Sequence, residues 1–125
     1  MTRTELEEYI LTNYGIEPDY PWSQYSSYAV FRHVGNKKWF AVVMSVPENK
    51  FGLAGAEEIN VVNLKCPPIL SGGVLGEKGI FPAYHMSKAN WISVSLDGSV
   101  DDDKIKMLLD VSFDATAPKI AKKKN

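Results

Sequence analysis

The sequence is poor in the residues from which most recognisable catalytic and metal sites are built. It has one cysteine and two histidines among 125 residues, and it contains no CxxC, HExxH, GxGxxG or P-loop motif. Cys66 cannot form an internal disulfide, which indicates a reducing, cytoplasmic setting. Two isolated histidines, His33 and His85, are more typical of structural roles than of a metal site. We therefore expect no catalytic residue, no bound metal and no cofactor.

Long apolar runs are also absent. None approaches the ~20 residues that a transmembrane helix needs, and Glu5, Glu7 and Glu8 interrupt any signal-peptide pattern at the N-terminus. We therefore expect no membrane association. Hydrophobic residues still make up 45% of the chain, which is enough for one core. The length and this composition predict a single domain over residues 1–118.

Positive charge is scarce in most of the chain. The formal net charge is −1, but four lysines lie within residues 119–125 without an acidic residue among them. We predict that this segment is a basic, disordered tail. Residues 1–118 then carry ten basic and fifteen acidic residues. Because so acidic a body is a poor general binder of polyanions, nucleic-acid binding would need a local basic patch.

Helical patterns mark both ends of the chain. Thr4 is predicted to cap a first helix, with Glu7 at the reciprocal capping-box position, and Gly15 to end it. The last helix is predicted to be capped by Ser99 or Asp101 and to end before Pro118. Three aspartates at residues 101–103 place negative charge at its positive end. Its apolar stripe follows the spacing i, i+3, i+4, i+7, i+8 and comprises Ile105, Leu108, Leu109, Ser112 and Phe113.

Strand signals fill the middle of the chain. Residues 28–34 and 37–46 are predicted to form a hairpin in which Gly35-Asn36 is a two-residue turn. Further strands are predicted over residues 58–65 and 91–96, with a short helix from Pro67 or Pro68 to about Leu75 and a loop over residues 76–90. The two-residue turn fixes the hairpin register and pairs Arg32 with Trp39, Phe31 with Phe40, and Val30 with Ala41.

This order of elements predicts an α+β fold, an antiparallel sheet with helices packed on one face. The residues predicted to face that core include Phe31, Phe40, Val42 and Met44. The other face of the sheet is predicted to remain open. Its outward residues are predicted to be Arg32, Trp39, Asn63, Lys65, Trp91, Ser93 and Ser95.

Residues 84–91, Tyr-His-Met-Ser-Lys-Ala-Asn-Trp, gather aromatic and titratable groups immediately before a predicted strand. Such groups at the mouth of a rigid element are typical of binding sites. The two indoles of the open face, beside Lys65 and Arg32, suit base stacking and phosphate contact. His85 and Lys88 are donors to an anion when charged. The candidate binding residues are Lys65, Tyr84, His85, Lys88, Trp91, Arg32 and Trp39.

Structural explanations remain open beside these functional ones. Arg32 also fits a cation–π contact that only covers Trp39. The open face also suits a homodimer or a protein partner, and Lys65, His85 and Lys88 suit a small anion. For Trp22, core packing is favoured over a role as a ligand platform.

Several segments carry a resemblance to a known family. They are Asn63–Pro67, Pro82–Lys88, Trp91–Val94, Leu96–Gly98 and Ser112–Phe113. Through them the chain resembles the MmcQ/YjbR-like proteins over roughly residues 4–116, and the pattern Tyr-His-Met-x-Lys-x-x-Trp is the most specific part.

This resemblance implies a fold similar to the CyaY-like α–β sandwich and a small cytoplasmic protein. It also implies a DNA-binding or regulatory role, by analogy with the double-wing domain of a phage transcription factor, and no assigned enzymatic activity or cofactor. Two positions depart from the family pattern. Phe113 stands where tyrosine is usual and Ser87 where asparagine is common, so a site that uses those groups would be altered here.

Overall fold

The computed structural model describes residues 1–25 and 27–118, so the basic tail predicted over residues 119–125 lies outside the described residues. Three α-helices and five strands confirm the predicted α+β class. The helices are α1 (Arg3–Tyr14), α2 (Pro68–Val74) and α3 (Asp102–Thr116), with short 3₁₀ helices η1 (Ser23–Tyr25) and η2 (Glu48–Phe51). The strands are β1 (Ala29–Arg32), β2 (Trp39–Pro47), β3 (Glu58–Lys65), β4 (Ile80–Pro82) and β5 (Trp91–Ser95).

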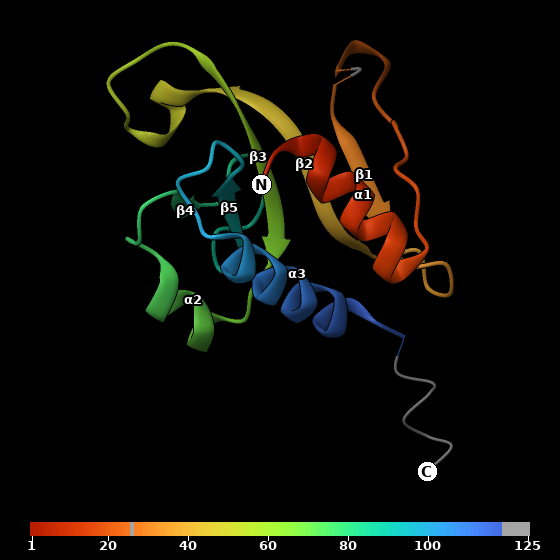
Figure 1. Ribbon diagram of the computed structural model, residues 1–125. Coiled ribbons are helices and arrows are strands. Elements are labelled where there is room, and N and C mark those ends of the chain that lie inside the picture. The colour runs from red at the N-terminus through yellow and green to blue at the C-terminus, as the bar shows by residue number, and fades with distance from the viewer. Residues whose placement is uncertain (26, 119–125) are drawn as a thin grey trace.

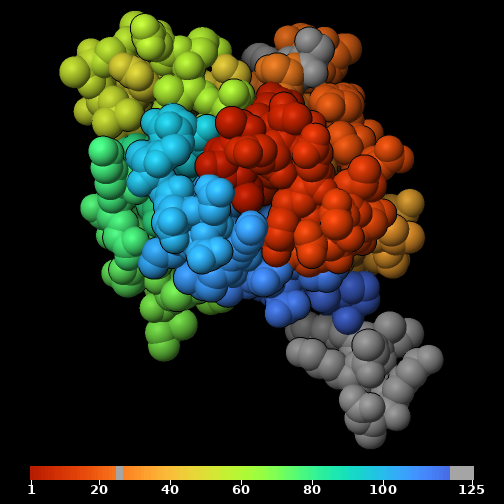
Figure 2. All heavy atoms as spheres, in the orientation of Figure 1, coloured from red at the N-terminus to blue at the C-terminus, as the bar shows by residue number. Residues whose placement is uncertain are grey.

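The five strands form one antiparallel sheet in the order β1-β2-β3-β5-β4. Helices α1 and α3 lie side by side over one face of it (Figure 1), and in the space-filling view they cover much of that face (Figure 2). Strand β4 was not predicted, and its residues were expected to lie in a loop. With three residues ending in proline, β4 is too short to show strand periodicity and is defined only by its pairing with β5.

The main core lies between this helix layer and the sheet. Leu6 and Ile10 of α1, and Ile105, Leu108 and Leu109 of α3, are all at most 1% exposed. They meet sheet residues that include Phe31, Val43, Val62, Leu64, Ile92 and Val94. The apolar stripe predicted for the last helix is therefore confirmed, and it fastens α3 to the middle of the sheet.

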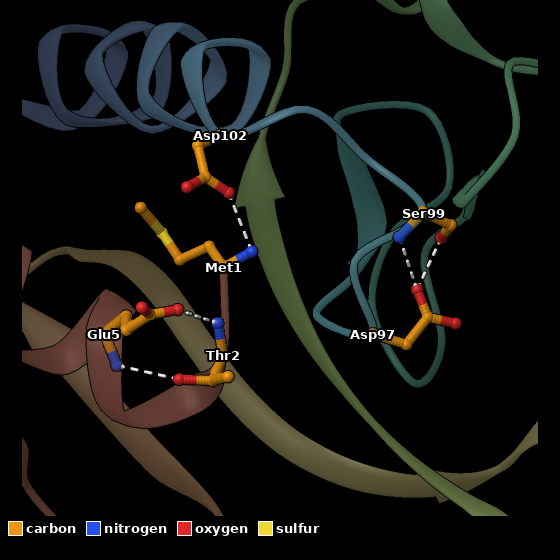
Figure 3. A network of polar contacts seen from close by, with 6 residues as sticks. All are labelled: Met1, Thr2, Glu5, Asp97, Ser99 and Asp102. Atoms are coloured by element: carbon orange, nitrogen blue, oxygen red, sulfur yellow. Dashed lines mark hydrogen bonds and ion pairs between the residues drawn. The ribbon is translucent and has the colours of Figure 1, made fainter.

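The start of α1 is fixed by a capping box and by a bond to α3 (Figure 3). Thr2 Oγ1 accepts a hydrogen bond from the Glu5 N–H at 3.2 Å, and the Thr2 N–H donates to Glu5 Oε1 at 2.8 Å. The predicted box at Thr4 and Glu7 was therefore two residues late, because the same motif occurs twice. The Met1 ammonium lies 2.7 Å from Asp102 Oδ1, which joins the beginnings of the two helices. Gly15, with φ of 69°, ends α1 as predicted.

The first hairpin contains a bulge that the sequence analysis did not anticipate. Arg32 pairs with Trp39 as predicted, but Phe31 pairs with Ala41 and Val30 with Val42, so Phe40 has no partner of its own on β1. The connection is also longer than two residues. The Lys37 N–H donates to the His33 carbonyl at 3.0 Å and the His33 N–H to the Lys38 carbonyl at 2.9 Å.

Because an inserted residue reverses the alternation of side chains, the bulge changes which residues face the helices. The helix-covered core contains Phe31, Phe40, Ala41 and Val43. The prediction that Val42 and Met44 share this face was wrong. Both lie on the opposite face of the sheet.

That opposite face is not open, as the sequence had suggested. It carries a second apolar cluster formed by Val30, Val42, Met44, Val46 and Val61, against which Trp22, Tyr28, Phe51, Tyr84 and Met86 pack from connecting segments. Asn63, Ser93 and Ser95, predicted to point outward into solvent, are at most 1% exposed. The predicted packing role of Trp22 is confirmed. We call this side the loop-covered face.

Candidate ligand-binding site

Three polar groups hold residues 84–91 against the loop-covered face. The Tyr84 N–H donates to Ser93 Oγ at 3.0 Å, and Ser93 Oγ donates to Asn63 Oδ1 at 2.5 Å. Asn63 Nδ2 closes the set by donating to the Tyr84 carbonyl at 2.8 Å. The buried side chains of Asn63 and Ser93 are thereby satisfied, which is the condition for burying them at little cost. The start of the 84–91 segment is fixed to the sheet by these bonds.

The end of the same segment is fixed to β3. The Trp91 N–H donates to the Ser87 carbonyl at 3.0 Å, which closes a turn, and the Asn90 carbonyl accepts from the Cys66 N–H at 2.7 Å. Lys88 lies exposed in this turn, three residues before Trp91. Cys66 itself is 1% exposed, and burial raises the pKa of its thiol. This cysteine is a packed apolar residue in a position to support the turn.

A basic pocket of about 400 Å³ opens where β2, β3 and β5 meet the end of α3. It is lined by Lys37, Lys38, Trp39, Lys65, Trp91 and Thr116. Lys65 and Trp91 are register partners on adjacent strands, and the Lys65 ammonium lies 5.9 Å from the Trp91 ring centroid, within cation–π range. Three cations and two indoles thus border a hollow that no acidic side chain lines.

The backbone beneath the basic pocket is anchored to the helix layer through one hydroxyl. The Lys65 N–H donates to Ser112 Oγ of α3 at 2.8 Å, and Ser112 Oγ donates to the Phe40 carbonyl at 2.5 Å. Ser112 is fully buried. It therefore ties β3, the bulge of β2 and α3 together directly behind Lys65, which gives the pocket a rigid floor.

An aromatic pocket of about 310 Å³ lies beside the basic one. It is lined by Trp22, Tyr28, Trp39, Val42, Met44, His85 and Met86. The Trp22 ring stands nearly perpendicular to Trp39, at 85° with centroids 5.6 Å apart, and to Tyr28, at 82° and 6.1 Å. Trp39 lines both pockets, so they are neighbours with a common wall and together make up the candidate site.

Two residues of this site have a backbone conformation that side chains disfavour. Lys37 has φ of 63° and His85 has φ of 58°. In the part of the chain that the structure describes, they are the only non-glycine residues with positive φ. This left-handed region costs a residue other than glycine roughly 1–2 kcal/mol. One of the two lines the basic pocket and the other lines the aromatic pocket, so the strain is concentrated at the candidate site.

The structure brings together only part of the predicted site. Trp39, Lys65 and Trp91 meet in the basic pocket, and Trp39 meets His85 in the aromatic pocket. Lys88 borders the site through the turn before Trp91 but lines neither pocket. The pocket residues Lys37, Lys38, Met44 and Met86 were not among the predicted site residues. The Lys-Lys run immediately before Trp39 was the visible signal for the first two.

Arg32 and Tyr84 are engaged in structural contacts. Arg32 Nη2 lies 2.5 Å from Asp19 Oδ2, and its guanidinium carbon lies 6.0 Å from the Trp39 ring centroid. It faces a different hollow, shared with Asp19 and His33. Tyr84 packs its ring 6.0 Å from Phe51 and 4.0 Å from the His85 ring. Arg32 supports Trp39 with its charge compensated, and Tyr84 anchors the segment that carries His85.

Within residues 1–25 and 27–118, no group of three or more histidine, cysteine, aspartate or glutamate side chains is placed to hold a metal ion. In the same residues no helix has the length and apolarity to cross a membrane. The chemistry that the described site offers is cationic and aromatic: ammonium groups for an anion, and indole and phenol rings for a planar or apolar group.

A comparison with protein-family models matches residues 11–115 to the YjbR model. The chain belongs to the YjbR family. This confirms the resemblance drawn from the motifs around Tyr84–Trp91. The Bacillus subtilis (strain 168) protein YyaQ is 41% identical over 116 residues, which cover 93% of this chain and 98% of that relative. The Escherichia coli (strain K12) protein YjbR is 32% identical over 77 residues, covering 60% of this chain and 65% of YjbR.

Solved structures that are similar to this chain support the fold. A crystal structure of a Pseudomonas syringae protein matches with a TM-score of 0.91 at 40% identity, covering 94% of this chain and all of that one. A DUF419 domain of a Deinococcus radiodurans protein matches with a TM-score of 0.62 at 20% identity, covering 90% of this chain and 75% of that one. At that identity the second likeness concerns the fold alone.

Proposed function

We propose that this YjbR-family chain is a nucleic-acid-binding module without catalytic activity, and that it binds a single strand through the basic pocket. The observation that carries the proposal is the pocket itself, in which Lys37, Lys38 and Lys65 surround the indoles of Trp39 and Trp91. Proteins that bind single strands combine a basic groove for phosphates with aromatic side chains on which bases stack. The described residues offer both on one surface.

The distribution of charge supports this location. Helices α1 and α3 contain seven of the fifteen acidic residues of the chain, whereas no acidic side chain lines the basic pocket. A strand approaching the protein is therefore repelled by the acidic helix surfaces and attracted to the basic pocket, although the net charge is negative. In this proposal the local positive charge of the basic pocket outweighs the negative net charge of the chain.

A structural rather than a catalytic role for His33 is supported by its contacts. Its Nε2 lies 3.0 Å from the Phe113 carbonyl and 2.9 Å from Thr116 Oγ1. In a neutral ring protonated on Nε2, this atom donates to both oxygens. Thr116 in turn donates to the Ser112 carbonyl at 2.8 Å. The arrangement gives the Nε2–H two acceptors and leaves Nε2 no lone pair with which to activate a nucleophile.

A second candidate function is self-association through the same surface. Trp39 and Trp91 are partly exposed at neighbouring positions, and aromatic residues of this kind anchor protein interfaces. Three lysines without a facing acidic group argue against it, because two copies of the pocket would bring like charges together. We therefore rank it below nucleic-acid binding.

The test is a salt-titrated binding assay with labelled single-stranded DNA, single-stranded RNA and duplex DNA, read by fluorescence anisotropy. Lys38→Ala and Lys65→Ala should each lower the affinity and reduce the salt slope by about one unit. Trp91→Ala should lose roughly 1–3 kcal/mol of binding free energy through lost stacking. Arg32→Ala should change the salt slope less, because Asp19 already compensates its charge.

Lys78→Ala is the matched control, since Lys78 is an exposed lysine that lies outside both pockets. It should leave affinity and salt slope unchanged. Site variants that behave like Lys78→Ala would refute the proposal. Light scattering on Trp91→Ala distinguishes the second candidate, because a shift of mass from dimer to monomer would favour self-association.

A further inference from the structure

We infer that the aromatic pocket receives one unstacked base of the strand whose phosphates lie in the basic pocket. The inference rests on the proposed function and goes beyond it, because it defines a second subsite and the form of nucleic acid that fits. It is carried by the wall that the two pockets share, by the shape and lining of the aromatic pocket, and by the strained residue at its edge.

The shared wall is Trp39, which lines both pockets. A nucleotide has the matching chemistry, because a single sugar joins its planar, largely apolar base to an anionic phosphate. With the phosphate among Lys37, Lys38 and Lys65, the base of the same or the next nucleotide meets Trp39 and enters the aromatic pocket. Neither a free anion nor an uncharged aromatic molecule would use both subsites.

The lining of the aromatic pocket suits a base but discriminates little between the four bases. Trp22 and Tyr28 supply rings beside Trp39, and Met44 and Met86 supply flexible thioethers that adapt to the shape of a ring. The volume of about 310 Å³ is at the low end of the range for small-molecule pockets and fits a group of nucleoside size. Stacking on such walls tolerates every base, since all bases have a π-face.

The edge of the pocket carries the backbone strain described above. His85 occupies the left-handed region with φ of 58°, on a segment whose ends are fixed by Asn63, Ser93 and Cys66. Strain that the surrounding structure maintains is typical of ligand-contacting positions. The fixed segment holds the imidazole beside the pocket opening before the ligand arrives. Since a base must leave its stack to enter, single strands should be preferred to duplexes.

The experiment compares two probes of equal length and charge: a thymidine octanucleotide and a fully abasic octanucleotide. The wild-type protein should bind the strand with bases at least tenfold more tightly, which is within the range expected for one or two stacked bases. Met86→Trp, which fills the pocket with a larger ring, should remove most of this preference. It should leave the salt slope unchanged, because the three lysines of the basic pocket are retained.

Ile69→Trp is the matched control, because Ile69 is 94% exposed on α2 and lines neither pocket. It should behave as the wild type does. Met86→Phe is the alternative filling variant if Met86→Trp lowers the melting temperature, and it should reduce the preference in part.

The outcomes separate this inference from the proposed function. Salt-dependent binding in which both filling variants keep the wild-type preference for bases would overturn the pocket assignment and leave the proposed function standing. Salt-dependent binding without any preference for bases in the wild type would overturn the pocket assignment and also the stacking on Trp39 and Trp91 that the proposed function includes. If the wild type binds neither octanucleotide at any salt concentration, the proposed function and the inference both fail.

Discussion

The two faces of the sheet are both apolar, but different kinds of structure cover them. On the helix-covered face, α1 and α3 place five buried side chains that are at most 1% exposed against the strands. On the loop-covered face, Trp22, Tyr28, Phe51, Tyr84 and Met86 come from connecting segments and are only partly buried. Both named pockets border this second face. The comparison suggests that one face provides stability and the other provides the site.

The physical reason is that helices and loops satisfy their backbone hydrogen-bonding groups in different ways. A helix satisfies its own backbone and presents a continuous apolar stripe, so it fills the space over a sheet closely. A loop must satisfy its backbone groups individually, as Tyr84 does through Asn63 and Ser93. Loops that are held by a few individual hydrogen bonds leave hollows between those bonds. Binding residues are accordingly common on loops that a rigid scaffold holds.

The largest expected effect is the loss of unfolding free energy when a side chain is truncated in the helix-covered core, compared with the same change on the loop-covered face. Leu108→Ala on α3 should cost about 2–5 kcal/mol of unfolding free energy, because the close-packed helix layer cannot collapse into the cavity. Met44→Ala on the loop-covered face should cost about 2 kcal/mol, the low end of that range, because Met44 already borders a hollow. Denaturant unfolding measures both. Equal losses would show that the loops pack as tightly as the helices.

The next effect concerns the attachment of the 84–91 segment. Asn63→Ala removes both the donor to the Tyr84 carbonyl and the acceptor for Ser93, and should cost about 1–3 kcal/mol because buried groups are left unsatisfied. Ser45→Ala is the matched control, since its hydroxyl bonds the exposed Glu58 at 2.9 Å. It should cost less than about 0.5 kcal/mol. A loss for Asn63→Ala no larger than the control would mean that the segment is held by its apolar contacts alone.

A pH effect is expected on the helix-covered side. Burial lowers the pKa of His33, although the Phe113 carbonyl and the charge of Asp114 oppose this. Below about pH 6.5 the unfolded chain therefore binds more protons than the folded one. The stability from neutral His33 is present in full above that value and is lost as pH falls toward the lowered folded-state pKa, at no more than about 1.4 kcal/mol per pH unit.

Replacement of the ring tests that assignment. His33→Gln should unfold with a flatter dependence on pH than the wild type between pH 7 and 5, measured by denaturant titration at each pH. Identical slopes in the two proteins would mean that protonation of His33 does not contribute to acid sensitivity.

The smallest expected effect tests the strain at the site. Lys37→Gly should leave stability unchanged or raise it by up to about 1 kcal/mol, because glycine accepts positive φ. Lys38→Gly, at the next residue with an ordinary φ, should instead lose about 0.5–1 kcal/mol. Both variants should weaken strand binding by removing a lysine of the basic pocket. Equal destabilisation by the two would contradict the idea that Lys37 stores strain.

Much of the helix-covered face could be predicted from the sequence. The stripe from Ile105 to Phe113 repeats at helical spacing, and Gly15 terminates α1, so both helices follow from local signals. Strand β3 was predicted with its observed ends, Glu58 and Lys65. Local periodicity was sufficient here because a regular element on one side of a sheet repeats its pattern without interruption.

The candidate site could be predicted only in part. Lys65 and Trp91 lie on adjacent strands whose regular alternation is visible in the sequence, and they do meet. The bulge at Phe40 changed the faces of Val42 and Met44, and a single inserted residue has no local signature in a strand of apolar residues. Met44 was therefore assigned to the wrong core, and the aromatic pocket that it lines was missed.

The sequence by itself determined the family, the α+β class, the two long helices and the residues that pack them on the sheet, because all of these depend on motifs and periodicities within short stretches. Only the tertiary structure decided that the second face is covered by loops, that Trp22 and Met86 line one pocket, and that Trp39 lines two pockets. Trp22 and Met86 alone lie 64 residues apart in the sequence. These contacts arise where irregular connections satisfy buried polar groups one at a time, and no local pattern encodes that arrangement.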